Sequence, residues 1–365
     1  MPMAPDKIRE PRRRRWLVVV LGIVVFIGLG QVILDHFREE EKSIRQRFRK
    51  AIVELFPEQA AKISASFGLR LYKNSSLSQT AKEQGKTDVV LIHGLDDPGK
   101  IWMNLAPALT YQGYRVWIMT YPNDQPVSES ARLFATELSD LRLNGINQIV
   151  IVAHSMGGLV SRQMLTDPDI DYSDQTESGQ IPVVVSLVMV GTPNNGSELA
   201  RLRGFTELRD QIARFSKGDG HWLGGILDGA GEAKLDLLPG SRFLETLNAR
   251  PHPEGIDMLV IAGIATPWNE AEIEMLALSL QEGAPENMFP MISDLKSVLL
   301  SMTHGLGDGL VTVDSASLEG IPLLTVPGTH LSIIRNLSKS SERIPPAVPI
   351  ITEWISRYSS DTQAD

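Results

Sequence analysis

Residues 148–159 read QIVIVAHSMGGL, and their pattern is the strongest indication of the fold class in this sequence. The apolar residues after Gln148 predict a buried strand, and the residues after Ser155 predict a helix. Small residues, Ala153 and Gly157, lie two positions before and two positions after Ser155. A serine on a sharp strand-to-helix turn needs such neighbours, because larger side chains would collide with the backbone of the turn. The helix N-terminus also favours negative charge beside the serine, so we predict that Ser155 is a nucleophile.

Apolar segments of strand length recur on both sides of this turn and alternate with segments of helical pattern. The expected strands are rich in Val and Ile throughout, so both of their faces are expected to be buried. Strands that alternate with helices in this way predict an α/β fold, with a mostly parallel sheet and helices on both faces. The expected strands are residues 88–93, 114–121, 148–153, 183–190, 258–264 and 323–326, and the first expected helices are residues 101–112, 127–143 and 156–165.

Five short motifs resemble those of α/β-hydrolases of the bacterial lipase and esterase type. The resemblance extends over residues 87–336. It implies an α/β-hydrolase fold with helical lid or cap insertions, and hydrolysis of carboxylic esters through an acyl-enzyme on the serine. The motifs are LIHGL at 91–95, AHSMGG at 153–158, GTPNNGS at 191–197, GDGLV at 307–311 and GTHL at 328–331.

A serine nucleophile needs a general base, and imidazole is the side chain that takes and returns a proton near neutral pH. In the fold that the resemblance implies, the chain order is serine, acid, histidine. His330 follows an apolar strand and fits this order, whereas His304 precedes the expected acid. Asp308, flanked by glycines, is the expected acid, and Asp314 is the alternative. Asp308 would hold the tautomer of His330 that accepts the serine proton.

Two backbone N–H groups are expected to stabilise the oxyanion of the reaction. One belongs to Met156, directly after the nucleophile, and the family places the other just past the His-Gly pair, at Leu95. Some lipases of this group bind calcium through an aspartate two residues after the histidine. This position is Ser332 here, so no such calcium site is expected. The chain also lacks zinc-protease, phosphate-loop and dinucleotide motifs, so no metal or other cofactor is expected.

The N-terminal part is expected to anchor the chain in the cytoplasmic membrane. Residues 1–15 carry six basic and two acidic side chains and are expected to be a cytoplasmic tail. Residues 16–34 are apolar apart from Gln31, and about 19 such residues nearly span a bilayer as a helix. The basic flank predicts that the rest of the chain lies outside the cytoplasm, in the periplasm or extracellular space. A signal peptide that is cleaved before secretion is the alternative.

The remainder divides into a stalk and a catalytic domain. Residues 35–86 are expected to form an amphipathic stalk and a polar linker, and residues 87–365 the catalytic domain. Two insertions, at about 196–255 and 266–303, are too long for simple connections. Both are expected to be helical, either as a lid or cap over the site or as packed core helices.

Composition narrows the classes of function. The net charge of −9 argues against a general affinity for nucleic acid, and the lack of cysteine excludes disulfides and thiolate metal sites. The expected partners are the ester or lipid substrate that the resemblance implies and the membrane that residues 16–34 indicate. Two other functions stay open: an acyltransferase that uses the same three residues with an alcohol acceptor, and a non-catalytic hydrolase fold that binds a partner.

Overall fold

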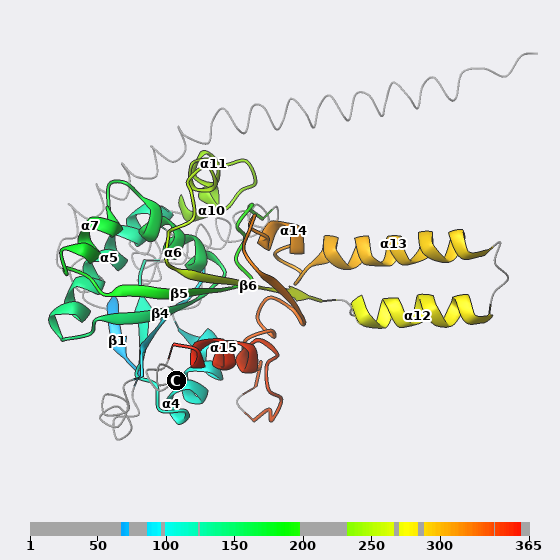
Figure 1. Ribbon diagram of the computed structural model, residues 1–365, viewed down its shortest axis with the longest axis horizontal. Helices are drawn as coiled ribbons and strands as arrows, with labels where there is room; N and C mark the ends of the chain where they lie inside the picture. Colours follow the sequence, from blue (N-terminus) through cyan, green and yellow to red (C-terminus); the bar gives the residue numbers. More distant parts are fainter. Residues whose placement is uncertain are drawn as a thin grey trace, which may run out of the picture.

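The computed structural model describes eight stretches of the chain, built around one central sheet (Figure 1). The expected tail at 1–15, the expected membrane span at 16–34 and most of the expected stalk lie outside the described residues. Within the described stretches, no helix combines the length and the hydropathy needed to cross a membrane. The stretches are residues 67–72, 86–95, 99–122, 125–197, 232–265, 270–283, 288–338 and 340–358.

Seven strands form one sheet in the order β1-β3-β2-β4-β5-β6-β7. Strands β2 to β7 run parallel, which confirms the predicted α/β-hydrolase sheet. Their register aligns Ile92, Ala153 and Met189, so β2, β4 and β5 end side by side. The strands are β1 (Gly68–Leu71), β2 (Asp88–Ile92), β3 (Val116–Thr120), β4 (Gln148–His154), β5 (Val183–Val190), β6 (Asp257–Ile264) and β7 (Leu323–Pro327).

Strand β1 differs from the prediction. The sequence placed its four residues in the stalk, before the expected domain boundary at residue 87, whereas the structure pairs them antiparallel with β3 at one edge of the sheet. Strand β1 is short, and its last two residues are exposed, so it lacks an apolar run that could have revealed it. The backbone N–H of Leu69 also donates to a carboxylate oxygen of Glu137, at 2.7 Å, which ties the strand to helix α5.

Helices cover both faces of the sheet (Figure 1). Helices α5, α6, α10 and α11 pack on one face, and α4 and α15 pack on the other. The short helices η1, α7 and α14 lie in the connections. The bounds are η1 (Lys100–Trp102), α4 (Leu105–Tyr111), α5 (Val127–Leu143), α6 (Met156–Thr166), α7 (Tyr172–Glu177), α10 (Glu232–Asp236), α11 (Arg242–Asn248), α14 (Val313–Ala316) and α15 (Ala347–Ser356).

The residues of β2 explain why two helical layers are needed. Val90 and Ile92 point into the cluster under α5 and α6, and Val89 and Leu91 point into the cluster under α4 and α15. All four side chains are fully buried. A strand that is apolar on both faces is stable only when both faces are covered, as the sequence pattern predicted.

The region expected to be a second cap, residues 266–303, contains a helical hairpin. Helix α12 (Glu270–Gly283) packs against helix α13 (Phe289–Leu306). The pair follows β6 and extends away from the sheet, well beyond the other helices (Figure 1). Much of the first expected cap, 196–255, lies outside the described residues; its described part contains α10 and α11.

The core predicts a clear difference between two large apolar residues of α5. Phe134 is fully buried between α5 and the sheet, whereas Leu143 at the end of the helix is 85% exposed. We expect Phe134→Ala to lower the free energy of unfolding by about 3–5 kcal/mol, because it leaves a cavity. Leu143→Ala is expected to change it by less than about 0.5 kcal/mol. Urea unfolding monitored by tryptophan fluorescence measures both, and equal effects would contradict this description of the core.

Candidate active site

Ser155 lies on the turn between β4 and α6, where the sequence predicted it. Its backbone has φ 55° and ψ −129°, and among the described residues only Asp171 is another non-glycine residue with positive φ. Such a conformation costs about 1–3 kcal/mol, and the surrounding structure must supply that energy. The Ser155 N–H donates to the carbonyl of Val190 at 2.8 Å, which fastens the turn to the end of β5.

Two glycines, one after the serine and one on the loop after β2, lie where a side chain would collide with neighbouring atoms. A Cβ atom at Gly157 would lie 2.4 Å from the carbonyl oxygen of Ile92 and 2.7 Å from that of His93. A Cβ atom at Gly94 would lie 2.6 Å from the Cβ of Ser155 and 3.1 Å from its Oγ. The loop after β2 therefore runs directly beside the serine hydroxyl, as an oxyanion loop must.

Asp308 and His330 form a buried pair. The Nδ1 of His330 lies 2.6 Å from Oδ2 of Asp308, and the two residues are only 7% and 2% exposed. The other carboxylate oxygen, Oδ1, accepts the N–H groups of Leu310 at 2.8 Å and Val311 at 2.7 Å. The N–H of His330 also donates to the backbone carbonyl of Asp308 at 2.9 Å. The carboxylate is thus fixed by its own loop and faces the imidazole with one oxygen.

The pair lies at the same end of the sheet as Ser155. A Cβ atom at Gly191, which has φ +59°, would be 3.1 Å from both Asp308 Oδ2 and His330 Nδ1. Gly191 directly follows Val190, the acceptor of the Ser155 N–H. The rings of His154 and His330 are 4.7 Å apart, centre to centre. The end of β5 and the residue before the serine therefore link the nucleophile turn to the acid–base pair.

The alternatives for acid and base lie elsewhere. Asp314 is exposed in the first turn of α14. Its described contacts are made through its backbone carbonyl, which accepts a hydrogen bond from the side chain of Asn195 at 3.2 Å. His304 belongs to the last turns of α13, in the hairpin. The structure thus places Asp308 and His330 beside the turn of Ser155, whereas Asp314 is exposed on α14. The side chain of His304 lies outside the described part of the chain.

The two expected oxyanion donors flank the serine. Met156 is the first residue of α6, and the first N–H groups of a helix have no partner within the helix. Leu95 follows Gly94 on the loop beside Ser155, with its side chain packed against the core. The loop is braced from behind: the Tyr121 hydroxyl donates to the carbonyl of His93 at 2.6 Å, and the two rings stack at 4.7 Å.

His154 is the residue of this site that sequence analysis missed. Its Nε2 lies 3.0 Å from the backbone carbonyl of His330, so Nε2 must carry the hydrogen of that bond. Burial lowers the pKa of His154 well below its ordinary value of 6.5, and the charge of protonated His330 lowers it further. His154 is therefore neutral and braces the backbone of His330. Nothing in the local pattern around the serine indicated a contact 176 residues away.

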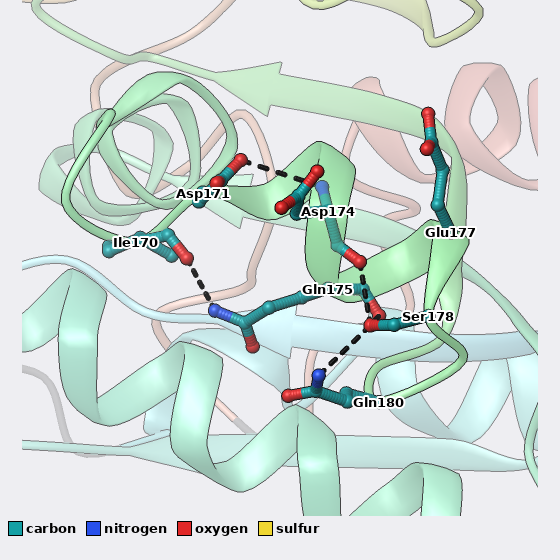
Figure 2. A pocket seen from close by; sticks show the side chains of 7 residues that line it. All are labelled: Ile170, Asp171, Asp174, Gln175, Glu177, Ser178 and Gln180. Atoms are coloured by element: carbon teal, nitrogen blue, oxygen red, sulfur yellow. Dashed lines mark hydrogen bonds between the residues drawn. The ribbon is translucent and has the colours of Figure 1, made fainter.

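The described residues offer no second reaction centre. The open pocket beside α7 is polar, and its groups bond mainly within their own loop (Figure 2). Gln175 donates to the Ile170 carbonyl, and Gln180 donates to the Ser178 hydroxyl at 3.0 Å. No three His, Asp or Glu side chains of the described stretches converge as metal ligands would. The pocket is lined by Ile170, Asp171, Asp174, Gln175, Glu177, Ser178 and Gln180.

Comparison with known proteins identifies the family. The sequence model described as the alpha/beta hydrolase family matches residues 89–286, more than half of the chain. The chain belongs to the alpha/beta hydrolase family. This match includes Leu95 and Ser155 and ends before Asp308 and His330. The search of curated proteins finds no match to this hydrolase.

Solved structures resemble this hydrolase at low identity. The mature lipase BlEst2 of Bacillus licheniformis is 21% identical, with a TM-score of 0.47, over 74% of this chain and 92% of that one. The phospholipase PlaB of Legionella pneumophila is 16% identical, with a TM-score of 0.48, over 76% and 61%. The Staphylococcus hyicus lipase is 15% identical, with a TM-score of 0.49, over 74% and 95%. The site described above is therefore assigned from the contacts of this chain.

The two aspartates provide a matched pair of variants. In Asp308→Asn the amide oxygen must stay toward the N–H groups of Leu310 and Val311, so the amide NH₂ faces Nδ1 of His330. His330 would then carry its proton on Nε2, the wrong tautomer to accept one. We expect kcat for a soluble short-chain ester to fall by about 10⁴-fold. Asp314→Asn is expected to leave kcat unchanged, and a comparable loss there would contradict the assignment of the acid.

Buried His154 predicts a contribution to the pH dependence of stability. Its pKa is lowered in the folded state, so below pH 6.5 the unfolded chain binds a proton that the folded chain does not. This site therefore lowers the unfolding free energy as the pH falls below 6.5, by at most about 1.4 kcal/mol per pH unit. His154→Gln keeps an N–H donor and removes the titration, so its stability should fall less between pH 7.5 and about 5.5 in urea titrations. His252→Gln, at the surface, is the control, and parallel curves for wild type and His154→Gln would refute the prediction.

Proposed function

We propose that the protein is a serine hydrolase that cleaves carboxylic esters, with acyl lipids as its substrates. The observation that supports this most directly is the buried Asp308–His330 hydrogen bond of 2.6 Å beside the strained turn of Ser155. A nucleophile, a base and a group that orients the base are the minimum set for acyl transfer through a covalent intermediate.

In the proposed reaction, Ser155 Oγ attacks the ester carbonyl while His330 Nε2 takes the hydroxyl proton. The negative charge that develops on the carbonyl oxygen is stabilised by the backbone N–H groups of Leu95 and Met156. His330 then gives its proton to the leaving alcohol, which departs and leaves an acyl group on Ser155. Water, deprotonated by His330, attacks this acyl-enzyme, and His330 then returns the proton to Ser155 Oγ as the carboxylic acid leaves.

Each proposed role has support in the local environment. Asp308 faces His330 with one oxygen while two backbone N–H groups hold the other, so the imidazole ring is oriented without a flexible partner. This arrangement stabilises the imidazolium that forms in the transition state. Neutral His154 beside it adds no second positive charge to the site.

We further propose that residues 16–34 anchor the protein in the cytoplasmic membrane, with the catalytic domain outside the cytoplasm. The apolar run and the arginines directly before it support this orientation. An anchored hydrolase of this kind would meet acyl lipids at the membrane surface, which is why lipids are the proposed substrate class.

The activated serine can be tested by covalent labelling. A fluorophosphonate probe reacts with a serine only where a base and an oxyanion site activate it, so the full-length protein is expected to be labelled. Ser155→Ala is expected to abolish labelling and to lower kcat for esters by at least about 10⁴-fold. Ser356→Ala, which removes an exposed hydroxyl on α15, is expected to keep both.

A folded protein that is not labelled, or that is labelled equally with Ser155→Ala, would refute the serine-hydrolase proposal. Esters of short and long acyl chains, offered with and without an acceptor alcohol, then separate esterase, lipase and acyltransferase by their products.

A further inference from the structure

The hairpin of α12 and α13 exposes an unusual amount of apolar surface. Large hydrophobic side chains that are more than a third exposed are isolated on most of the described chain, but they gather on this hairpin. Met275 is 62% exposed, Leu278 51% and Met291 60%. Contiguous exposed apolar surface of this kind marks a site of interaction in a soluble domain.

The hairpin needs only part of its apolar content to hold together. Ile273 and Ala277 of α12 and Ile292 of α13 are buried, and the two helices pack against each other. Most of the exposed apolar residues belong to two stretches, 275–280 and 288–291, which together form what we call the apolar end of the hairpin; Leu295 of α13 is also 46% exposed. They are therefore not required to join the two helices, and they lie far from the sheet (Figure 1).

The hairpin carries its exposed charged side chains outside the apolar end. The apolar end, as defined, contains no charged residue. The base of α12 carries the exposed Glu270, Glu272 and Glu274, and Lys296 forms an ion pair with Glu274. Glu282 is exposed beside the turn between the helices. Exposed glutamates thus lie along α12 both before and after residues 275–280 of the apolar end.

We propose that the apolar end of this hairpin docks on the surface of an uncharged or zwitterionic lipid bilayer. The same chain contains residues 16–34, an apolar run of the length that spans a bilayer, only about thirty residues before the first strand. That tether would keep the hairpin close to lipid at all times. Neither helix of the hairpin is apolar and long enough to span, so the hairpin lies in the interface.

The charge pattern opposes the other possible occupants. A second copy of the hairpin would place the exposed glutamates of both chains near one another, and Lys296, which pairs with Glu274, is the one basic side chain on the described surface of the hairpin. Anionic lipid would be repelled by the same glutamates, and the described surface supplies no cluster of basic side chains to attract it. The proposed contact is therefore driven by apolar burial and not by charge. It goes beyond the proposed reaction, because it does not require that any ester be cleaved.

The chain has no cysteine, so a single engineered cysteine can be labelled specifically in the full-length protein. The two variants are Met291→Cys and Leu143→Cys, both at strongly exposed positions. Each is labelled with a fluorophore and inserted into phosphatidylcholine nanodiscs that hold one chain each. We expect brominated phosphatidylcholine to quench the label at 291 several times more than the label at 143. Equal quenching of both labels by aqueous iodide, without lipid quenching at 291, would overturn the proposal.

Two further comparisons test whether the quenching depends on the apolar end and on the charge of the lipid. Met275→Ser with Leu278→Ser is expected to reduce lipid quenching at 291 at least twofold, whereas Leu337→Ser with Ile344→Ser, which are exposed elsewhere, leaves it unchanged. Hydrolysis of a soluble short-chain ester, where present, should be unaffected by both pairs. Stronger quenching by brominated phosphatidylglycerol than by brominated phosphatidylcholine would overturn the proposal in favour of charge-driven binding. Self-quenching of the label at 291 in nanodiscs that hold two chains, in place of lipid quenching, would overturn it in favour of a dimer. Failure of the ester-hydrolysis proposal would leave the quenching result interpretable.

Discussion

The structure depends on one strained residue, Ser155, held with positive φ at the end of β4. A serine relaxes from this conformation unless its neighbours prevent it. Here the neighbours are the backbone of β5, which accepts the Ser155 N–H, and the end of β2, which lies against Gly157. These elements are parallel strands with a common register, so β2, β4 and β5 must pair for the turn to be stable. The fold and the reactive geometry are therefore consequences of the same packing.

The acid–base pair is built on a different principle. Asp308 and His330 come from loops 22 residues apart, and neither is in a strained conformation. Their positions are set by hydrogen bonds: two N–H groups on one oxygen of Asp308, and the backbone of His330 held by both Asp308 and His154. The pair lies against Gly191, where a Cβ atom would be 3.1 Å from both partners, and the residue before it, Val190, accepts the Ser155 N–H. The serine turn is thus held in its strained conformation by packing of the strands, whereas the acid–base pair is held by hydrogen bonds.

This difference explains what the sequence could predict. The turn at Ser155 is local, so its strand, its small residues and its helix are all visible within twelve residues. Asp308 and His330 could be chosen because the chain order in this fold limits the candidates. Strand β1 is too short to have a pattern, and the contact of His154 with the His330 carbonyl spans 176 residues. The orientation of the hairpin could not be predicted either, because helical periodicity does not indicate which element a helix packs against.

Two histidines lie with ring centres 4.7 Å apart in the site, and the environment makes them unequal. His154 is fully buried and lacks a carboxylate partner, so water cannot stabilise its charged form and its pKa is lowered. His330 has the carboxylate of Asp308 at 2.6 Å, which orients its ring. The neutral ring of His154 holds the backbone that carries His330, because its Nε2 lies 3.0 Å from the His330 carbonyl. One ring of the pair is thus available to the proposed reaction, and the other supports it from behind.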